Sequence, residues 1–368
     1  MEVLEDVVKS CYIHIPFCNK ICSYCDFCKV LYDKRFISKY LDSLEKEIDT
    51  LYKGEELETL YIGGGTPSSL SVEELEKLFI ILQKFKKKKI FEFSIECNFD
   101  SINFEKLLLF KKYGVNRLSF GLESTNQEIL KFLNRDFDRK HAINIVNEAR
   151  KLGFNNINID LMYAFPKESM EMLNKDLDFI LDLDVEHIST YSLIIEPHTK
   201  LFLDKVKNIS TDIDFDMYKN ISDKLKESGY IHYEISNFAK EGYYSHHNLA
   251  YWKNEEYYGF GVSSSSYLGN ERITNSRSIT SYIKGNYNFS EEVLSVDDMM
   301  SYEMILGLRT SFGVSKDEFF DKYGVTLESK FDYQDLINNK LLIEKDGKLV
   351  IPCSKWYVIN SILINFLR

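Results

Sequence analysis

Short apolar, β-branched runs alternate with longer amphipathic segments over the first two hundred residues, and this alternation restricts the fold more than any other feature of the chain. Six runs have the length and composition of buried strands: Cys11–Ile15, Leu57–Ile62, Ile90–Cys97, Val115–Leu122, Asn155–Met162 and His187–Ile194. Helical patterns lie between them: Arg35–Leu51, Val72–Phe85, Asn103–Tyr113, Arg139–Leu152 and Met170–Leu181. Such spacing is typical of parallel β/α units, and about six fit, two fewer than in a closed eight-stranded barrel. We therefore predict an α/β fold built on a partial, open (β/α)6 barrel of the TIM type.

The rest of the chain differs in character from this core. A helical pattern at Phe215–Ser228 precedes a tract dense in Tyr, His, Asn and Ser, and a small helix-rich unit begins near residue 297. That unit contains a predicted hairpin, Leu341–Ile351, with its turn at Lys345-Asp346-Gly347. The Lys86–Lys89 run is interpreted as the solvated end of a helix. We expect three parts: the barrel core at 1–205, a middle segment at 206–296, and a winged-helix-like α+β domain at 297–368.

Charge and hydropathy exclude two classes of protein. Acidic residues outnumber basic ones by 57 to 46, giving a net charge of -11, which argues against a nucleic-acid binder. No apolar stretch approaches the roughly 20 residues that span a bilayer. The acidic start, Met1–Asp6, lacks the basic and apolar regions of a signal peptide. We expect a cytoplasmic protein, and the sequence does not distinguish a monomer from a homodimer.

A cluster of cysteines follows the first predicted strand. The chain has 7 cysteines, an odd number with four of them close together, which is not the pattern of a disulfide framework. Cys18, Cys22 and Cys25 form a C-x3-C-x2-C motif. A [4Fe–4S] cluster normally takes four thiolates, so three would leave one iron open to an exchangeable ligand. The alternative is structural zinc, with His14 or Cys28 as the fourth ligand.

The string Tyr12-Ile13-His14-Ile15-Pro16-Phe17-Cys18, continued by Cys22-Ser23-Tyr24-Cys25-Asp26-Phe27, resembles the opening of the radical S-adenosylmethionine (SAM) superfamily. More narrowly, it resembles the branch of oxygen-independent coproporphyrinogen III dehydrogenases and HemW-type heme chaperones. The resemblance implies a [4Fe–4S] cluster on the three cysteines, with SAM chelating the open iron. It also implies cleavage of SAM to a 5′-deoxyadenosyl radical by an electron from a donor such as flavodoxin or ferredoxin.

Further residues match the superfamily's SAM pocket. Gly63-Gly64-Gly65-Thr66-Pro67 follows the second strand, where glycines let the backbone approach a ligand closely or form a tight turn. Glu96 and Asp160 lie near the ends of two strands, where barrels carry their sites, although both could be solvated strand ends. Glu123 departs from the glutamine that the family usually has. The resemblance implies SAM contacts at Tyr12, Tyr24, Gly64, Gly65, Thr66, Glu96, Glu123, Arg135 and Asp160, with Arg135 paired to the SAM carboxylate.

A histidine beside aromatic residues stands in the middle segment, in the string His247-Asn248-Leu249-Ala250-Tyr251-Trp252. Such a histidine can supply an axial iron ligand with a stacking surface, or it can be hydrogen-bonded within a small aromatic core. The string resembles the heme-binding signature of the HemW-type chaperones, which implies that His247 ligates heme. The adjacent His246 could substitute for it. Val262–Ser266 replaces a family string that contains a histidine.

Three hypotheses about function stay open. Two follow from the resemblance, and in the third a zinc ion only stabilises the fold. The first is a heme chaperone that carries a [4Fe–4S] cluster with SAM, binds heme and transfers it to apo-hemoproteins. The second is an oxygen-independent coproporphyrinogen III dehydrogenase, which removes two propionate carboxylates as carbon dioxide. Phe27 occupies the place of the dehydrogenases' fourth cysteine, and only a short segment precedes Cys18. Both features favour the chaperone.

Overall fold

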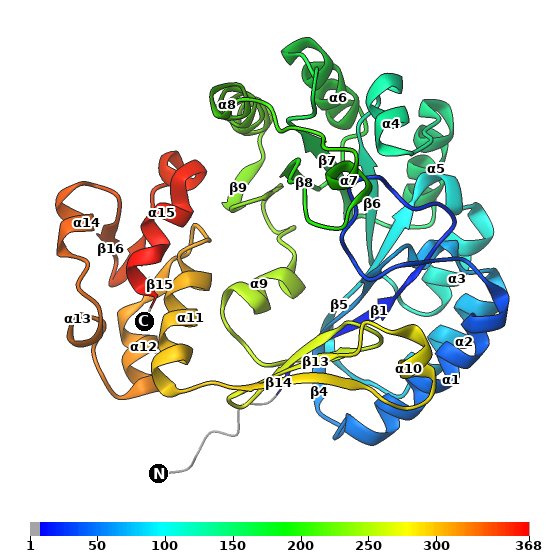
Figure 1. Ribbon diagram of the computed structural model, residues 1–368, viewed down its shortest axis with the longest axis horizontal. Coiled ribbons are helices and arrows are strands. Elements are labelled where there is room, and N and C mark those ends of the chain that lie inside the picture. Colours follow the sequence, from blue (N-terminus) through cyan, green and yellow to red (C-terminus); the bar gives the residue numbers. More distant parts are fainter. Residues whose placement is uncertain (1–7, 368) are drawn as a thin grey trace.

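The computed structural model describes residues 8–367, so the acidic start Met1–Asp6 lies outside it. One sheet of 12 strands dominates the fold (Figure 1). Its centre consists of six parallel strands in chain order: β1 (Ser10–Ile15), β4 (Glu56–Gly64), β5 (Lys86–Asn98), β6 (Arg117–Glu123), β7 (Ile157–Tyr163) and β8 (His187–Ser192). Within the described residues the sheet ends at two different strands, β14 (Asn288–Val293) and β9 (Ile231–Glu234), so the predicted open arrangement of six β/α units is confirmed.

Helices connect the central strands, as the sequence predicts. They are α1 (Lys34–Leu51), α2 (Val72–Leu82), α3 (Phe104–Lys112), α5 (Arg139–Lys151) and α6 (Met170–Asp182). Side-chain caps define their starts: Ser71 and Glu74 form a capping box on α2, and Asp138 accepts from two backbone N–H groups of α5. A further short helix, α4 (Gln127–Leu133), is not among the predicted elements.

The Lys86–Lys89 prediction is wrong. These lysines begin strand β5, where Lys86 and Lys87 pair with Glu56 and Leu57 of β4. Helix α2 has already ended at Leu82. The Lys88 ammonium lies 2.5 Å from the Glu58 carboxylate, so cross-strand ion pairing makes a basic run compatible with an extended strand.

The two faces of the central strands differ sharply in polarity. Residues such as Ile13, Ile62 and Phe120 pack with the helices into the main hydrophobic core. Their alternating neighbours, including Tyr12 and Glu96, lie on the opposite face, which is polar. Closed barrels fill this interior with layers of apolar side chains. Here the interior instead carries polar and titratable groups, which suits it to hold a ligand.

The segment 206–296 adds strands to both edges of this sheet. Its strands and helices are α8 (Thr211–Glu227), β9 (Ile231–Glu234), β10 (Asn237–Ala239), α9 (His246–Trp252), β11 (Tyr257–Phe260), β12 (Ser265–Leu268), β13 (Glu271–Asn275), α10 (Ile279–Ile283) and β14 (Asn288–Val293), preceded by α7 (Lys200–Leu203). Strand β10 pairs with β8, and β11 pairs parallel with β1. In Figure 1, α9 lies between the core and the C-terminal helices.

The C-terminal unit has its own hydrophobic core around Trp356. Its elements are α11 (Val296–Gly307), β15 (Val314–Ser315), α12 (Lys316–Tyr323), α13 (Leu327–Lys330), α14 (Gln334–Asn338), β16 (Ile343–Lys345), β17 (Lys348–Val350) and α15 (Ile359–Leu363). The predicted hairpin is confirmed as β16–β17, and its turn residues Asp346 and Gly347 both have positive φ (52° and 73°). No helix in the described part of the chain is long and apolar enough to cross a membrane.

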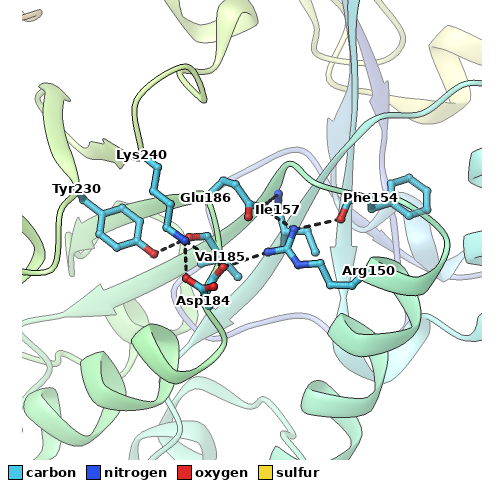
Figure 2. A network of polar contacts seen from close by, with 8 residues as sticks. All are labelled: Arg150, Phe154, Ile157, Asp184, Val185, Glu186, Tyr230 and Lys240. Atoms are coloured by element: carbon cyan, nitrogen blue, oxygen red, sulfur yellow. Dashed lines mark hydrogen bonds and ion pairs between the residues drawn. The ribbon is translucent and has the colours of Figure 1, made fainter.

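A polar network holds the start of two barrel strands, β7 and β8, together (Figure 2). The Glu186 carboxylate accepts hydrogen bonds from the Ile157 backbone N–H at 3.0 Å and from Arg150 Nη1 at 2.8 Å. Glu186 is buried, whereas the side chain of the neighbouring Asp184, which pairs with Lys240, is largely exposed. Because a buried N–H without a partner is costly, the Glu186 contacts are the ones expected to matter for stability.

We expect E186A to lower the free energy of unfolding by roughly 2 kcal/mol, because it leaves the buried Ile157 N–H without an acceptor and removes the carboxylate partner of Arg150. The control is D184N, which removes a solvent-exposed ion pair with Lys240 and should cost under about 0.5 kcal/mol. Urea unfolding followed by circular dichroism measures both. Equal losses in the two variants would contradict the prediction.

Candidate functional site

The cysteine loop is fixed at both ends and in its middle. Two short parallel strands, β2 (Phe17–Cys18) and β3 (Val30–Leu31), close its base. In the middle, the Ser23 N–H donates to the Leu133 carbonyl at 2.9 Å, and the Ser23 carbonyl accepts from the Leu201 N–H at 3.1 Å. Helix α4, which the sequence analysis does not predict, therefore helps to hold the loop at the open end of the barrel.

The three predicted cysteine ligands have defined surroundings in this loop. Cys18 is buried, while Cys22 and Cys25 are partly exposed. Thr66 Oγ1 lies 3.6 Å from the Cys18 sulfur, and Arg135 Nη1 lies 3.5 Å from the Cys22 sulfur. Burial raises the pKa of the Cys18 thiol to about 11, and burial also raises the pKa of the Cys22 and Cys25 thiols. Metal binding must therefore displace protons from these thiols.

The residues present fit a [4Fe–4S] cluster, in which each thiolate binds a different iron. Cys18, Cys22 and Cys25 lie in one loop, and none of them is in a disulfide. A methyl group on Gly65 would come within 2.8 Å of the Cys18 sulfur, so this glycine leaves the space beside the thiol open. His14, the zinc candidate, has both ring nitrogens hydrogen-bonded, to the Tyr12 hydroxyl and the Cys28 carbonyl.

The glycine turn and Glu96 contact each other directly. The Gly64 N–H donates to Glu96 Oε2 at 3.0 Å, and the Tyr61 hydroxyl donates to Oε1 at 3.1 Å. Burial, together with the nearby Asp160 carboxylate, raises the pKa of Glu96 to about 7. Asp160 lies beside Gly121 in the strand register and accepts from the Asn158 amide at 2.8 Å. The predicted SAM contacts on β4, β5 and β7 thus share the polar interior, and their role stays a prediction.

Glu123, Arg135 and Tyr24 form one buried network at the end of β6. Arg135 Nη2 lies 3.0 Å from Glu123 Oε2, and the Tyr24 hydroxyl donates to Glu123 Oε1 at 2.8 Å. Glu123 has φ of 59°, an uncommon backbone conformation for a side chain of this kind. The glutamate that departs from the family's glutamine is therefore the counter-ion of the arginine that the resemblance pairs with the SAM carboxylate.

His247 lies at the start of α9, inside the barrel. Its Nδ1 is 2.8 Å from Thr59 Oγ1, its Nε2 is 2.8 Å from the Tyr251 hydroxyl, and its ring stacks on Tyr61 with centroids 5.0 Å apart. Burial lowers the pKa of His247 to about 3, so its ring is neutral at pH 7. The neighbouring His246 is exposed to solvent.

A cavity of about 480 Å³ connects His247 with the Glu96 region, and this volume is in the range of roughly 300–1,000 Å³ typical of ligand sites. Five tyrosines line it: Tyr12, Tyr61, Tyr191, Tyr251 and Tyr257. Arg272 also lines it. Sequence reasoning missed Tyr61, Tyr191, Tyr257 and Arg272. Tyr61 could have been found, since it stands two residues before Gly63 and shares its strand face, whereas Arg272 has no local signal.

The comparisons with known proteins agree with this geometry. The model of the radical SAM superfamily matches residues 12–180, and the model of the HemN C-terminal domain matches residues 294–357. A protein named heme chaperone HemW from Lactococcus lactis is 38% identical over 97% of this chain and 97% of its own length. The chain belongs to the radical SAM superfamily, in its HemW branch. A HemW from Bacillus subtilis is 40% identical over 88% of this chain and 89% of its own.

The fold of this radical SAM protein is also that of a solved structure. Coproporphyrinogen III oxidase from Escherichia coli superimposes with a TM-score of 0.87 over 99% of this chain and 91% of that one, at 24% identity. That likeness supports the fold, including the predicted C-terminal α+β unit. Membership of the superfamily establishes a [4Fe–4S] cluster and SAM as the cofactors. Together these groups supply the reducing chemistry of the superfamily.

Proposed function

We propose that this protein is a heme chaperone, which binds heme in the tyrosine-lined cavity and transfers it to apo-hemoproteins. The observation that carries the proposal is a neutral, buried His247 in the wall of an aromatic cavity of about 480 Å³. Neutral imidazole is the form that ligates iron, and tyrosine rings offer stacking surface to a flat macrocycle. The HemW names of the relatives from two bacteria support the same function.

In this proposal the [4Fe–4S] cluster and SAM bind at the end of the barrel interior that carries the cysteine loop. Cys18, Cys22 and Cys25 would hold the cluster and would leave one iron open to SAM. The Gly64–Thr66 backbone would bind the amino group of SAM through its carbonyl oxygens, because a protonated amino group only donates hydrogen bonds. Arg135 would meet the carboxylate of SAM. The remaining contacts assigned to SAM are Tyr12, Tyr24, Glu96, Glu123 and Asp160.

Heme ligation by His247 requires one exchange of partners. Thr59 holds Nδ1, while Nε2 is bonded to Tyr251, which lines the same cavity. Nε2 is therefore the nitrogen on the cavity side, and the Tyr251 hydroxyl must give way to iron. The Thr59 hydroxyl on Nδ1 orients the ring for such a bond.

We expect H247A to weaken hemin binding by at least about tenfold, which corresponds to about 1.4 kcal/mol, and to shift the Soret band. The measurement is an anaerobic hemin titration of the cluster-reconstituted protein. The matched control is H246A on the same helix turn, whose exposed ring should not affect affinity. Loss in H246A with none in H247A would move the ligand to His246.

Failure of the wild-type protein to bind hemin would reject the chaperone proposal. The alternative function, that of the coproporphyrinogen III oxidase from Escherichia coli, would then be tested by turnover of coproporphyrinogen III to a product lacking two carboxylates.

A further inference from the structure

Arg272 belongs to the wall of the tyrosine-lined cavity but comes from a different part of the sheet than the groups described so far. It lies on β13, in the extension that follows β11. Its guanidinium carbon is 4.8 Å from the ring centroid of Tyr267 and 4.2 Å from that of Tyr302. Two rings therefore restrict the guanidinium plane before any ligand arrives.

The guanidinium keeps hydrogen-bonding capacity for a ligand. Its Nε is buried and has no hydrogen-bond partner among residues 8–367, and Nη2 makes a long contact of 3.4 Å to Asn254 Oδ1. The Tyr257 hydroxyl oxygen also accepts a hydrogen bond from the guanidinium, so the Nε N–H is the donor that stays available to a ligand. Glu255, a carboxylate on the same cavity wall, lies 4.0 Å from the Lys253 ammonium. A buried N–H that lacks an acceptor gains a hydrogen bond when a ligand supplies one.

A restricted cation with an unused N–H, in the wall of a ligand-sized cavity, is suited to bind an anion. Arginine matches a carboxylate with two parallel hydrogen bonds. The same cavity offers tyrosine rings and His247 to a flat, iron-containing group. A ligand that satisfies both ends combines a flat aromatic body with carboxylates at one edge, and heme with its two propionates has this chemistry.

We propose that Arg272 binds a heme propionate and thereby fixes which edge of the macrocycle faces the β12–β14 extension of the sheet. This inference rests on the proposed function, because it assumes that heme occupies this cavity. Arg272 acts on the orientation and affinity of heme and not on the bond to iron.

The test compares hemin with hemin dimethyl ester, in which both carboxylates are blocked. Wild-type protein should bind hemin about tenfold more tightly than the ester, since a charged hydrogen bond is lost with the ester. R272M should bind both probes with the affinity that the wild type has for the ester, and its Soret maximum should stay unchanged. R139M is the matched control, because Arg139 also stacks on a ring, Phe179, at 4.4 Å but lies outside this cavity.

Each remaining outcome overturns the inference. Equal binding of the two probes by the wild type would show that no propionate is recognised. A loss in R272M that is as large for the ester as for hemin would assign Arg272 a structural role. If the wild type binds neither probe, the proposed function itself fails, which is a different result from hemin binding without a preference for free carboxylates.

Discussion

C22A is expected to abolish the iron–sulfur cluster, whereas C28A, in the same loop and three residues after Cys25, should leave it intact. In the proposed site Cys18, Cys22 and Cys25 would supply the three protein thiolates, so removal of one would leave only two for a four-iron cluster. The Cys28 thiol instead donates to the Arg277 carbonyl at 3.3 Å, outside the group of three. Iron and acid-labile sulfide should fall to background in C22A after anaerobic reconstitution.

C28A controls for the loss of any thiol from this loop, and the thermal midpoint of each variant controls for folding. We expect the same loss of cluster in C18A and C25A. A stable cluster in C22A, or an equal loss of iron in C28A, would require Cys28 to be a ligand. Cys28 would then act as a metal ligand, the role that the sequence analysis gave it only in the zinc alternative.

The core and the cluster loop could be predicted from sequence because their signals are local. Strand and helix patterns have the right period, and three cysteines within eight residues indicate a metal-binding loop. The capping residue Ser71 even marks the start of α2. Local patterns also explain why the β16–β17 hairpin could be predicted: Asp346-Gly347 is the sequence that its turn requires.

The rest of the site depends on contacts between distant segments, which no local pattern reports. Glu92 of β5 accepts hydrogen bonds from the backbone of His246 and His247, so the start of α9 is fixed by a residue more than 150 positions earlier. Arg272 reaches the cavity only because β13 joins the sheet through β11 and β12. The Lys86–Lys89 error has the same origin, since Glu58 on the neighbouring strand stabilises an extended lysine run.

The sheet extension that carries Arg272 is itself held by one buried carboxylate on α1, that of Glu47. The Glu47 side chain is fully buried and accepts hydrogen bonds from the Gly261 N–H at 2.9 Å, from the Tyr282 hydroxyl and from the Asn275 amide. These donors come from the end of β11, from α10 and from β13. A single side chain therefore connects α1 to three successive parts of the extension.

We expect E47A to lower the free energy of unfolding by about 3 kcal/mol, because the buried Gly261 N–H and Tyr282 hydroxyl lose their acceptor, Asn275 loses one of its three, and a cavity replaces the carboxylate. Glu45, on the same helix, pairs with Lys84 at 2.8 Å on the surface, and E45A should cost under about 0.5 kcal/mol.

Burial raises the pKa of Glu47 above its ordinary 4.5. The free energy of unfolding of the wild type therefore falls, relative to that of E47A, as the pH rises from 4.5 through the raised pKa of Glu47. The difference in this free energy between the two proteins should narrow over that pH range. Urea unfolding across this pH range measures both effects, and an E47A loss no larger than that of E45A would show that apolar packing alone holds the extension.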